Sequence, residues 1–155
     1  MHISTIMFST TSTHALRALA HLARVPAKTY VLGRDLAAAA NIPANYLSKI
    51  LLALRNAGLV VTSRGCGGGY RLSRPPDEIS LAEVVRIFDG NRAASGCVLA
   101  SADLCSDNQP CAAHEQWRPV RRVYTEFIRS TSISDISGGA ERAQLAPLGK
   151  SGGAS

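Results

Sequence analysis

Three cysteines and one histidine lie close together in the second half of the chain. Cys97, Cys105, Cys111 and His114 follow one another with the spacing C-x7-C-x5-C-x2-H, in a segment rich in small and turn-forming residues. Thiolate sulfur and imidazole nitrogen bind transition metals, and thiolates are also oxidised to disulfides. These four side chains are therefore the residues of this chain best suited to metal or redox chemistry.

Four interpretations of this cysteine-rich segment are open. Three thiolates on one loop can converge on an iron–sulfur cluster, which needs soft sulfur ligands. Three cysteines and a histidine can also bind structural zinc, although a C-x2-C pair is missing. A thiol–disulfide switch without metal is the third interpretation, and thiols without any chemical role are the fourth. Cys66 lies apart among glycines, either as an incidental exposed thiol or as an oxidisable one.

The first half of the chain is strongly basic. The protein has 155 residues, with 17 Lys and Arg against 11 Asp and Glu. Residues 1–90 hold 10 basic and 5 acidic residues, and from 17 to 74 nine basic residues accompany a single acid, Asp35. Such a surface attracts polyanions because binding releases condensed counterions. Charge alone also fits an ordinary solvated surface, so the pattern of secondary-structure elements has to decide.

Several classes of protein are disfavoured by what the sequence lacks. No apolar run reaches the roughly 18 residues of a membrane span, and residues 1–13 lack the basic flank and apolar core of a signal peptide. We therefore expect a cytoplasmic protein with no membrane partner, in which cysteines are metal ligands or reactive thiols rather than disulfides. No Ser-His-Asp set, paired catalytic carboxylates or dinucleotide fingerprint stands out, so we expect neither an enzyme nor a small-molecule substrate.

The spacing of apolar residues predicts a mainly α fold with one small β-hairpin. A turn at 41–43 separates two short helices, and Gly58 is expected to cap the third helix in a left-handed conformation. Ser80 and Glu83 form a capping box at the start of a fourth helix. The expected helices are 13–25, 34–40, 44–57, one that follows Ser80 and one in the segment 115–136, where a short helical turn is expected around 134–136. The expected strands are 59–63 and 70–72.

Three short helices followed by a glycine-tipped hairpin predict a winged helix-turn-helix. In such folds the third helix enters the major groove of DNA, and the hairpin, or wing, contacts the backbone or the minor groove. Side chains opposite the apolar stripe of the third helix should therefore face DNA, together with the base and tip of the wing. The expected DNA-binding residues are Asn45, Tyr46, Ser48, Lys49, Arg64, Gly67 and Gly68, with Arg55 as a further candidate.

Longer strings of residues carry a family resemblance. They are THALRAL at 13–19, NYL at 45–47, LRNAGLV at 54–60 and SRGCGGGYRL at 63–72. With the three-cysteine loop and the His-x-x-Trp that follow, the chain resembles the bacterial Rrf-type winged-helix regulators, the group of IscR and NsrR, over residues 7–136. The resemblance implies a homodimer that binds operator DNA and carries an iron–sulfur cluster.

The resemblance also implies a set of cluster ligands. Cys97, Cys105 and Cys111 match the three cysteines, and His114 matches the histidine ligand of IscR-like members. NsrR-like members take a carboxylate from near the first helix of the partner subunit, where this chain has Thr13, a poor ligand. The first gap between cysteines is longer than in either subgroup. The cluster type therefore does not carry over directly from these subgroups. The resemblance favours a [2Fe–2S] cluster, with [4Fe–4S] as the alternative.

The whole chain is expected to contain a DNA-binding domain at 1–90, a cluster-binding loop at 91–114, a dimerisation helix at 115–136 and a disordered tail at 137–155. The long helix should carry its apolar side chains on one face, a pattern typical of packing on a partner's equivalent helix. That face consists of Trp117, Val120, Tyr124, Phe127 and Ile128. We expect a transcriptional regulator, by default a repressor, that senses redox state, nitric oxide or iron–sulfur status. The alternative is a cluster-independent winged-helix regulator that uses a thiol switch or structural zinc.

Overall fold

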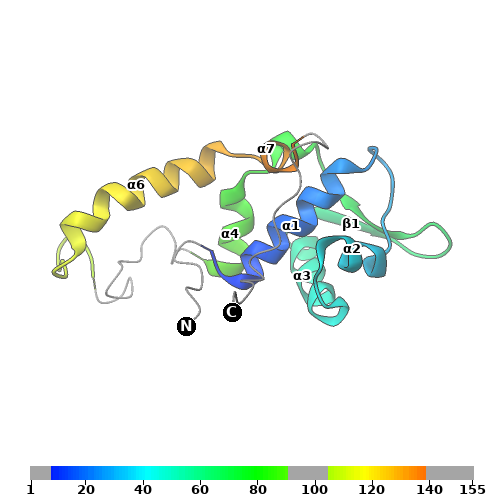
Figure 1. Cartoon of the computed structure of the whole chain (residues 1–155), viewed down its shortest axis with the longest axis horizontal. Helices are drawn as coiled ribbons and strands as arrows, with labels where there is room; N and C mark the ends of the chain where they lie inside the picture. The colour runs from blue at the N-terminus through cyan, green and yellow to red at the C-terminus, as the bar shows by residue number, and fades with distance from the viewer. Residues whose placement is uncertain (1–7, 91–104, 139–155) are drawn as a thin grey trace, which may run out of the picture.

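The computed structural model describes residues 8–90 and 105–138 of the chain. Helices α1 to α4 and a hairpin form one body, and α6 extends away from it (Figure 1). No helix in the described part is both long and apolar enough to cross a membrane. The elements are α1 (Thr10–Arg24), α2 (Gly33–Ala40), α3 (Ala44–Asn56), β1 (Val60–Ser63), β2 (Gly69–Leu72), the 3-10 turn η1 (Pro76–Glu78), α4 (Leu81–Asp89), α6 (His114–Ser130) and α7 (Ile133–Ser137).

Helix α1 begins three residues earlier than the sequence predicted, because two side chains satisfy its first turn. The Ser9 hydroxyl accepts a hydrogen bond from the Ser12 amide at 3.0 Å. The Asp89 carboxylate, at the end of α4, accepts one from the Ser9 amide at 3.0 Å and another from the Ser12 hydroxyl at 2.8 Å. Acceptors at a helix N-terminus pair with amides that have no partner inside the helix. The start of α1 therefore depends on a residue 80 positions away.

The tight turn between α2 and α3 is confirmed. Asn41 adopts a left-handed conformation with φ of 55°, and the Ile42 amide donates to the Ala37 carbonyl at 2.9 Å. Pro43 then precedes α3, whose apolar stripe faces the core as predicted. That stripe consists of Leu47, Ile50, Leu51 and Leu54, each at most 1% exposed.

The wing is an antiparallel hairpin of β1 and β2, in a register that places Ser63 opposite Gly69. Val31 forms a single antiparallel bridge to β2: its amide donates to the Tyr70 carbonyl at 2.9 Å, and the Tyr70 amide donates to the Val31 carbonyl at 2.8 Å. A Cβ atom on Gly69 would collide with the Val31 carbonyl, and Gly69 has a φ of 138°. Only glycine allows this close approach, so Gly69 ties the wing to the segment before α2.

Helix α4 starts with the predicted capping box. The Ser80 hydroxyl accepts from the Glu83 amide at 3.3 Å, and the Glu83 carboxylate accepts from the Ser80 amide at 3.1 Å. Glu83 also accepts from the Arg74 guanidinium at 2.5 Å. Burial alone would raise the pKa of Glu83, but the hydrogen bonds from Arg74 and Ser80 outweigh it and hold this pKa below its ordinary value. The segment after the wing is thereby fastened to α4.

The segment predicted for residues 115–136 forms two helices, α6 and α7, and α7 contains the short helical turn expected around 134–136. Two backbone hydrogen bonds to the start of α4 separate them: the Leu81 amide donates to the Thr131 carbonyl at 2.9 Å, and the Ile133 amide donates to the Ile79 carbonyl at 2.8 Å. Helix α7 then packs on α1, with Ile133 completely buried. The body that carries α3 and the wing therefore includes α7 as well as residues from the predicted first domain, 1–90. Most of the predicted tail lies outside the described residues.

Candidate DNA-binding surface and metal centre

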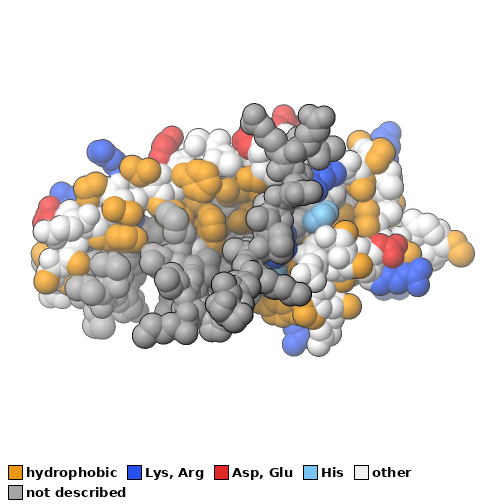
Figure 2. All heavy atoms as spheres, in the orientation of Figure 1, with side chains coloured by type: hydrophobic (Ala, Val, Ile, Leu, Met, Phe, Trp, Pro, Cys, Tyr) orange, Lys and Arg blue, Asp and Glu red, His pale blue; other side chains and the backbone are white. Residues whose placement is uncertain are grey.

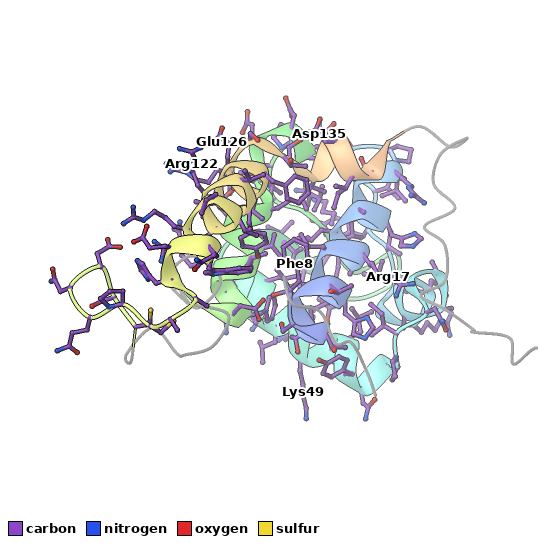
Figure 3. The ribbon with its side chains drawn as sticks, turned by 60° about the vertical axis from the view of Figure 1, so that its left-hand side comes forward. Phe8, Arg17, Lys49, Arg122, Glu126 and Asp135 are labelled. Atoms are coloured by element: carbon purple, nitrogen blue, oxygen red, sulfur yellow. The ribbon has the colours of Figure 1, made fainter. Side chains whose placement is uncertain are left out.

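The outer face of α3 carries three of the predicted DNA-binding side chains. Asn45, Ser48 and Lys49 are exposed on the side opposite the buried stripe, and Lys49 projects away from the body (Figure 3). The Ser48 hydroxyl donates to the Ala44 carbonyl one turn earlier at 2.9 Å. Arg55 is exposed further along the same helix. The geometry of α3 is therefore that of a helix free to enter a groove.

Tyr46, also predicted to bind DNA, is turned partly inward. It is half-buried, its hydroxyl shares a hydrogen bond with the Thr11 hydroxyl, and the His14 ring meets it edge-on at 5.5 Å. Burial, and then the charge of Arg17, lower the pKa of His14, so its ring is neutral near pH 7. Tyr46 therefore links α3 to α1, and its hydroxyl is already engaged within the chain.

The predicted wing residues differ in their exposure. Arg64 is exposed at the wing base, and Gly67 is exposed with a φ of 76°. Gly68 is buried, its amide donates to the Gly65 carbonyl at 3.0 Å, and a Cβ atom there would collide with the Ser63 carbonyl. The prediction that Gly68 contacts DNA is therefore not supported. This glycine closes the turn at the wing tip, and its amide is used for that purpose.

The cysteine-rich segment brings two of its predicted ligands into contact. Cys105 and His114 are 5% and 4% exposed, and Cys105 Sγ lies 3.2 Å from His114 Nδ1. The Cys111 amide donates to the same sulfur at 3.3 Å. His114 is the first residue of α6, one position earlier than predicted. The loop thus folds back so that sulfur and imidazole face each other at the start of the long helix.

Asp107 is a site residue that the sequence reasoning missed. Its carboxylate Oδ1 lies 3.0 Å from His114 Nε2, on the side of the ring opposite Cys105. Its position between two of the cysteines was the only available signal, because an acidic residue in a loop is ordinarily a solvated one. The His114 ring is therefore held at both nitrogens.

The contacts of the described ligands fit a metal site in part. Sulfur and nitrogen atoms bound to one tetrahedral metal at about 2.3 and 2.1 Å lie roughly 3.5 Å apart, close to the 3.2 Å between Cys105 and His114. Cys97 lies outside the described residues, and among those described no three acidic, cysteine or histidine side chains form a complete metal-binding group. The chemistry of the donors suits iron or zinc, and the described residues bring two of these donors, Cys105 and His114, together.

The apolar residues of α6 divide into two faces, where the sequence predicted one. Tyr124 and Ile128 are each 5% exposed and pack against the core, whereas Val120, Val123 and Phe127 are 44%, 66% and 46% exposed. Figure 2 shows apolar side chains gathered on the surface along this helix. Val123, the most exposed of them, was not predicted. The exposed residues form an uncovered stripe, which we call the α6 stripe.

The α6 stripe continues into a hollow in the body. Phe127 borders an apolar cavity of about 210 Å³ between α1, α4 and α7. A side chain inserted there would bury apolar surface on contact with the core. The other lining residues are Phe8, Thr13, Leu16, Arg17, Ala20, Leu81 and Ile136.

The comparison with protein families decides the identity. The family model described as "Rrf2: Iron-dependent Transcriptional regulator" matches residues 8–138, from the first turn of the body to the end of α7. The chain belongs to the Rrf2 family of transcriptional regulators. The predicted fold class and regulatory role are thereby confirmed, and the relatives of this Rrf2 protein are regulators rather than enzymes.

Individual relatives agree with this assignment. A candidate HTH-type transcriptional regulator of Mycobacterium tuberculosis is 38% identical over 135 residues, which are 87% of this chain and 83% of the relative. The regulator IscR of Aliivibrio salmonicida is 32% identical over 102 residues, covering 66% of this chain and 60% of that one. These similarities extend beyond the wing.

Solved structures show the same fold. CymR, the global cysteine regulator of Bacillus subtilis, superposes on this Rrf2 protein with a TM-score of 0.72 at 27% identity, covering 86% of this chain and 97% of that one. IscR of T. potens superposes with a TM-score of 0.68 at 27% identity, covering 90% and 91% of the two chains. The winged helix and the long helix are therefore shared features of these regulators.

Proposed function

We propose that this Rrf2 regulator represses transcription as a homodimer on palindromic operators, and that an iron–sulfur cluster controls its affinity for DNA. Cys97, Cys105, Cys111 and His114 would hold the cluster. The observation that carries the proposal is the buried contact of Cys105 Sγ with His114 Nδ1 at 3.2 Å, with Cys111 adjacent. Buried sulfur and nitrogen donors on one loop suit iron.

The position of His114 at the start of α6 supports a regulatory role for the proposed ligands. His114 begins α6, and the second half of the same helix packs on the core through Tyr124 and Ile128. Helix α4, which α6 contacts, in turn contacts α1 and α3. When bound, the cluster would exchange electrons, or it would be lost under oxidation, nitrosylation or iron shortage. A change in the loop would then alter the direction of α6 and, in a dimer, the distance between the α3 helices of the two subunits. Cluster binding and DNA binding would thereby be linked by a coupling free energy.

The α6 stripe supports dimerisation. Three half-exposed apolar side chains in a row, continued by an apolar hollow, make a surface that a second copy of the helix can cover. A two-fold axis along this stripe pairs each α6 with its equivalent and presents two α3 helices to two half-sites. The expected palindromic operator follows from this symmetry.

The cluster is tested by purifying the protein without oxygen and measuring visible absorption, iron and acid-labile sulfide together. A brown protein with matching iron and sulfide supports the proposal, and separate replacement of the proposed ligands by alanine should then lower iron content. These ligands are Cys97, Cys105, Cys111 and His114. Cys66→Ala is the matched control, because Cys66 lies exposed in the wing. A colourless protein without iron and sulfide contradicts it.

A second candidate function uses the cysteines as a thiol switch without a cluster. The observation that favours it is the 3.3 Å hydrogen bond from the Cys111 amide to Cys105 Sγ, which brings two cysteine residues together. Treatment with peroxide and then alkylation distinguishes the two functions by mass spectrometry. A reversible disulfide that changes operator affinity in iron-free protein supports the switch. Zinc found in place of iron supports the structural metal site instead.

A further inference from the structure

Both nitrogen atoms of the His114 imidazole contact neighbouring side chains. Nδ1 lies 3.2 Å from Cys105 Sγ, and Nε2 lies 3.0 Å from Asp107 Oδ1. The histidine side chain is only 4% exposed, whereas the aspartate side chain is 74% exposed. The three residues therefore form a short chain of contacts that leads from solvent through the ring to the sulfur.

The carboxylate of Asp107 determines which ring nitrogen carries the proton. A neutral imidazole has one N–H, and an ionised carboxylate can only accept a hydrogen bond. In a neutral ring, the N–H therefore lies at Nε2, facing the Asp107 carboxylate, and the lone pair of Nδ1 faces Cys105. Histidines that bind metals commonly donate their second N–H to a carboxylate, which fixes the ring and raises its basicity as a ligand.

The turn that holds Asp107 is built independently of its carboxylate. The Ser106 amide donates to the Gln109 carbonyl at 3.1 Å, and the Gln109 amide donates back to the Ser106 carbonyl at 3.1 Å. The Gln109 amide also donates to the Ser106 hydroxyl at 3.1 Å. A change of side chain at Asp107 therefore leaves the hydrogen bonds of this turn in place.

We infer that Asp107 is the positioning residue of the metal site: it fixes His114 in the Nε2–H tautomer and directs Nδ1 toward the position that Cys105 also faces. This inference rests on the proposed function, in which His114 is a ligand. The neighbouring Glu115 carboxylate lies 3.5 Å from the Arg118 guanidinium and is exposed. Asp107 and Glu115 are thus two acidic residues of equal charge close to His114, of which Asp107 hydrogen-bonds to its ring.

The test compares Asp107→Ala, Asp107→Asn and Glu115→Gln in the full-length protein, reconstituted with iron and sulfide without oxygen. Loss of the carboxylate in Asp107→Ala should accelerate iron release to a chelator by roughly 10- to 100-fold and shift the reduction potential. The rate of iron release from Asp107→Asn should lie between those of Asp107→Ala and the unchanged protein, because the asparagine amide oxygen still accepts from Nε2–H. Glu115→Gln should release iron at the same rate as the unchanged protein. If Asp107→Ala releases iron no faster than Glu115→Gln, the inference is overturned.

A second measurement does not depend on the cluster. The ¹⁵N chemical shifts of the His114 ring in metal-free protein, recorded with the ring neutral, identify the protonated nitrogen. Nε2–H in the unchanged protein and in Asp107→Asn, with a mixture of tautomers in Asp107→Ala, supports the positioning role even in a protein that takes up no iron. The expected tautomers in a protein that takes up no iron would contradict the cluster proposal, while Asp107 would remain the residue that orients His114. A proton on Nδ1 of the unchanged protein overturns the inference.

Discussion

Ser12 and His114 are the buried polar side chains of the part of the chain that the structure describes, and both depend on an aspartate. Ser12 is completely buried and donates to Asp89 at 2.8 Å, and His114 contacts Asp107 at 3.0 Å. A buried polar group without a partner costs free energy. The DNA-binding body and the candidate metal site therefore use the same device, in which an acidic side chain satisfies a buried group from another element or turn.

Replacing Asp89 should destabilise the body. Asp89→Ala leaves the Ser12 hydroxyl and the Ser9 amide without their acceptor, so we expect a loss of roughly 1–3 kcal/mol in the free energy of unfolding. Urea denaturation followed by circular dichroism measures it. Asp77→Ala in the exposed η1 turn is the control and should have little effect. Equal losses in the two variants would contradict the role of Asp89.

Two histidines of α1 should make stability depend on pH. Burial lowers the pKa of both His14 and His21 below 6.5, with added repulsion from nearby arginines. The unfolded state therefore binds more protons just below pH 6.5, so this contribution to stability is complete above that pH and is lost as pH falls. We expect the Tm to decline between about pH 7.5 and about pH 5.5.

The double variant His14→Gln, His21→Gln isolates this effect. Its Tm should decline less over the same interval, because glutamine does not titrate, and differential scanning calorimetry measures the difference. Parallel curves for the variant and the unchanged protein would show that other groups cause the pH dependence.

At the scale of elements, α3 is the part that should contact DNA. Lys49 projects from it, and Arg122 lies on α6 far from it (Figure 3). Lys49→Gln should weaken binding to all DNA sequences and reduce the salt dependence by about one counterion. Fluorescence anisotropy titrations at several salt concentrations measure this. Arg122→Gln, an equal change of charge, should leave affinity and slope unchanged, and an equal effect of both variants would point to unspecific charge.

Helix α6 should hold two copies of the chain together through the α6 stripe. Val123→Glu places a charge at the most exposed apolar position of that helix, where dimer formation would bury it at high cost. We expect monomers by sedimentation velocity and a lower affinity for a palindromic operator. Arg122→Glu introduces the same side chain at the exposed position directly before Val123 and outside the α6 stripe, and this variant should remain dimeric. A monomeric unchanged protein would remove the dimer from the proposal.

At the scale of the whole molecule, residues near the two ends of the described chain close one core. Helix α7 packs on α1, and the Ile133 amide donates to the Ile79 carbonyl at 2.8 Å. The reading helix α3 and the wing are thus supported by a segment that follows the long α6. The proposed movement of α6 would therefore act between α4 and α7, two elements that pack in the same body.

Loss of the Ile133 side chain should therefore weaken the entire DNA-binding body. Ile133 is completely buried, and Ile133→Ala should cost about 2–5 kcal/mol in unfolding free energy. Hydrogen exchange should show lower protection in α1 and α3 as well as in α7. Leu52→Ala, which trims a side chain that is 49% exposed, is the control. Protection lost only in α7 would mean that α7 unfolds as a separate unit.

The sequence by itself determined the elements whose signals are local. The bounds of α3 follow from the stripe of Leu47, Ile50, Leu51 and Leu54 and from the proline and glycine beside it, and the structure agrees. The capping box of α4 and the glycine-tipped wing were predicted for the same reason. Helical and strand periodicity, caps and turns act over a few residues, so the chain carries this information in short strings. The family resemblance rests on the same strings.

Only the tertiary structure decided features that join residues far apart. Asp89 sets the start of α1 from 80 positions away, and backbone pairing with the start of α4 fixes where α6 ends and α7 begins. The chain also showed one apolar face on α6, which the fold divides into a buried side and an exposed stripe. Asp107 became a site residue only because the loop folds back onto His114. The physical reason is common to all four features: each depends on a contact between residues that only the packing of the whole chain brings together. The spacing of apolar residues indicates that a surface is buried, but it does not indicate which element covers that surface.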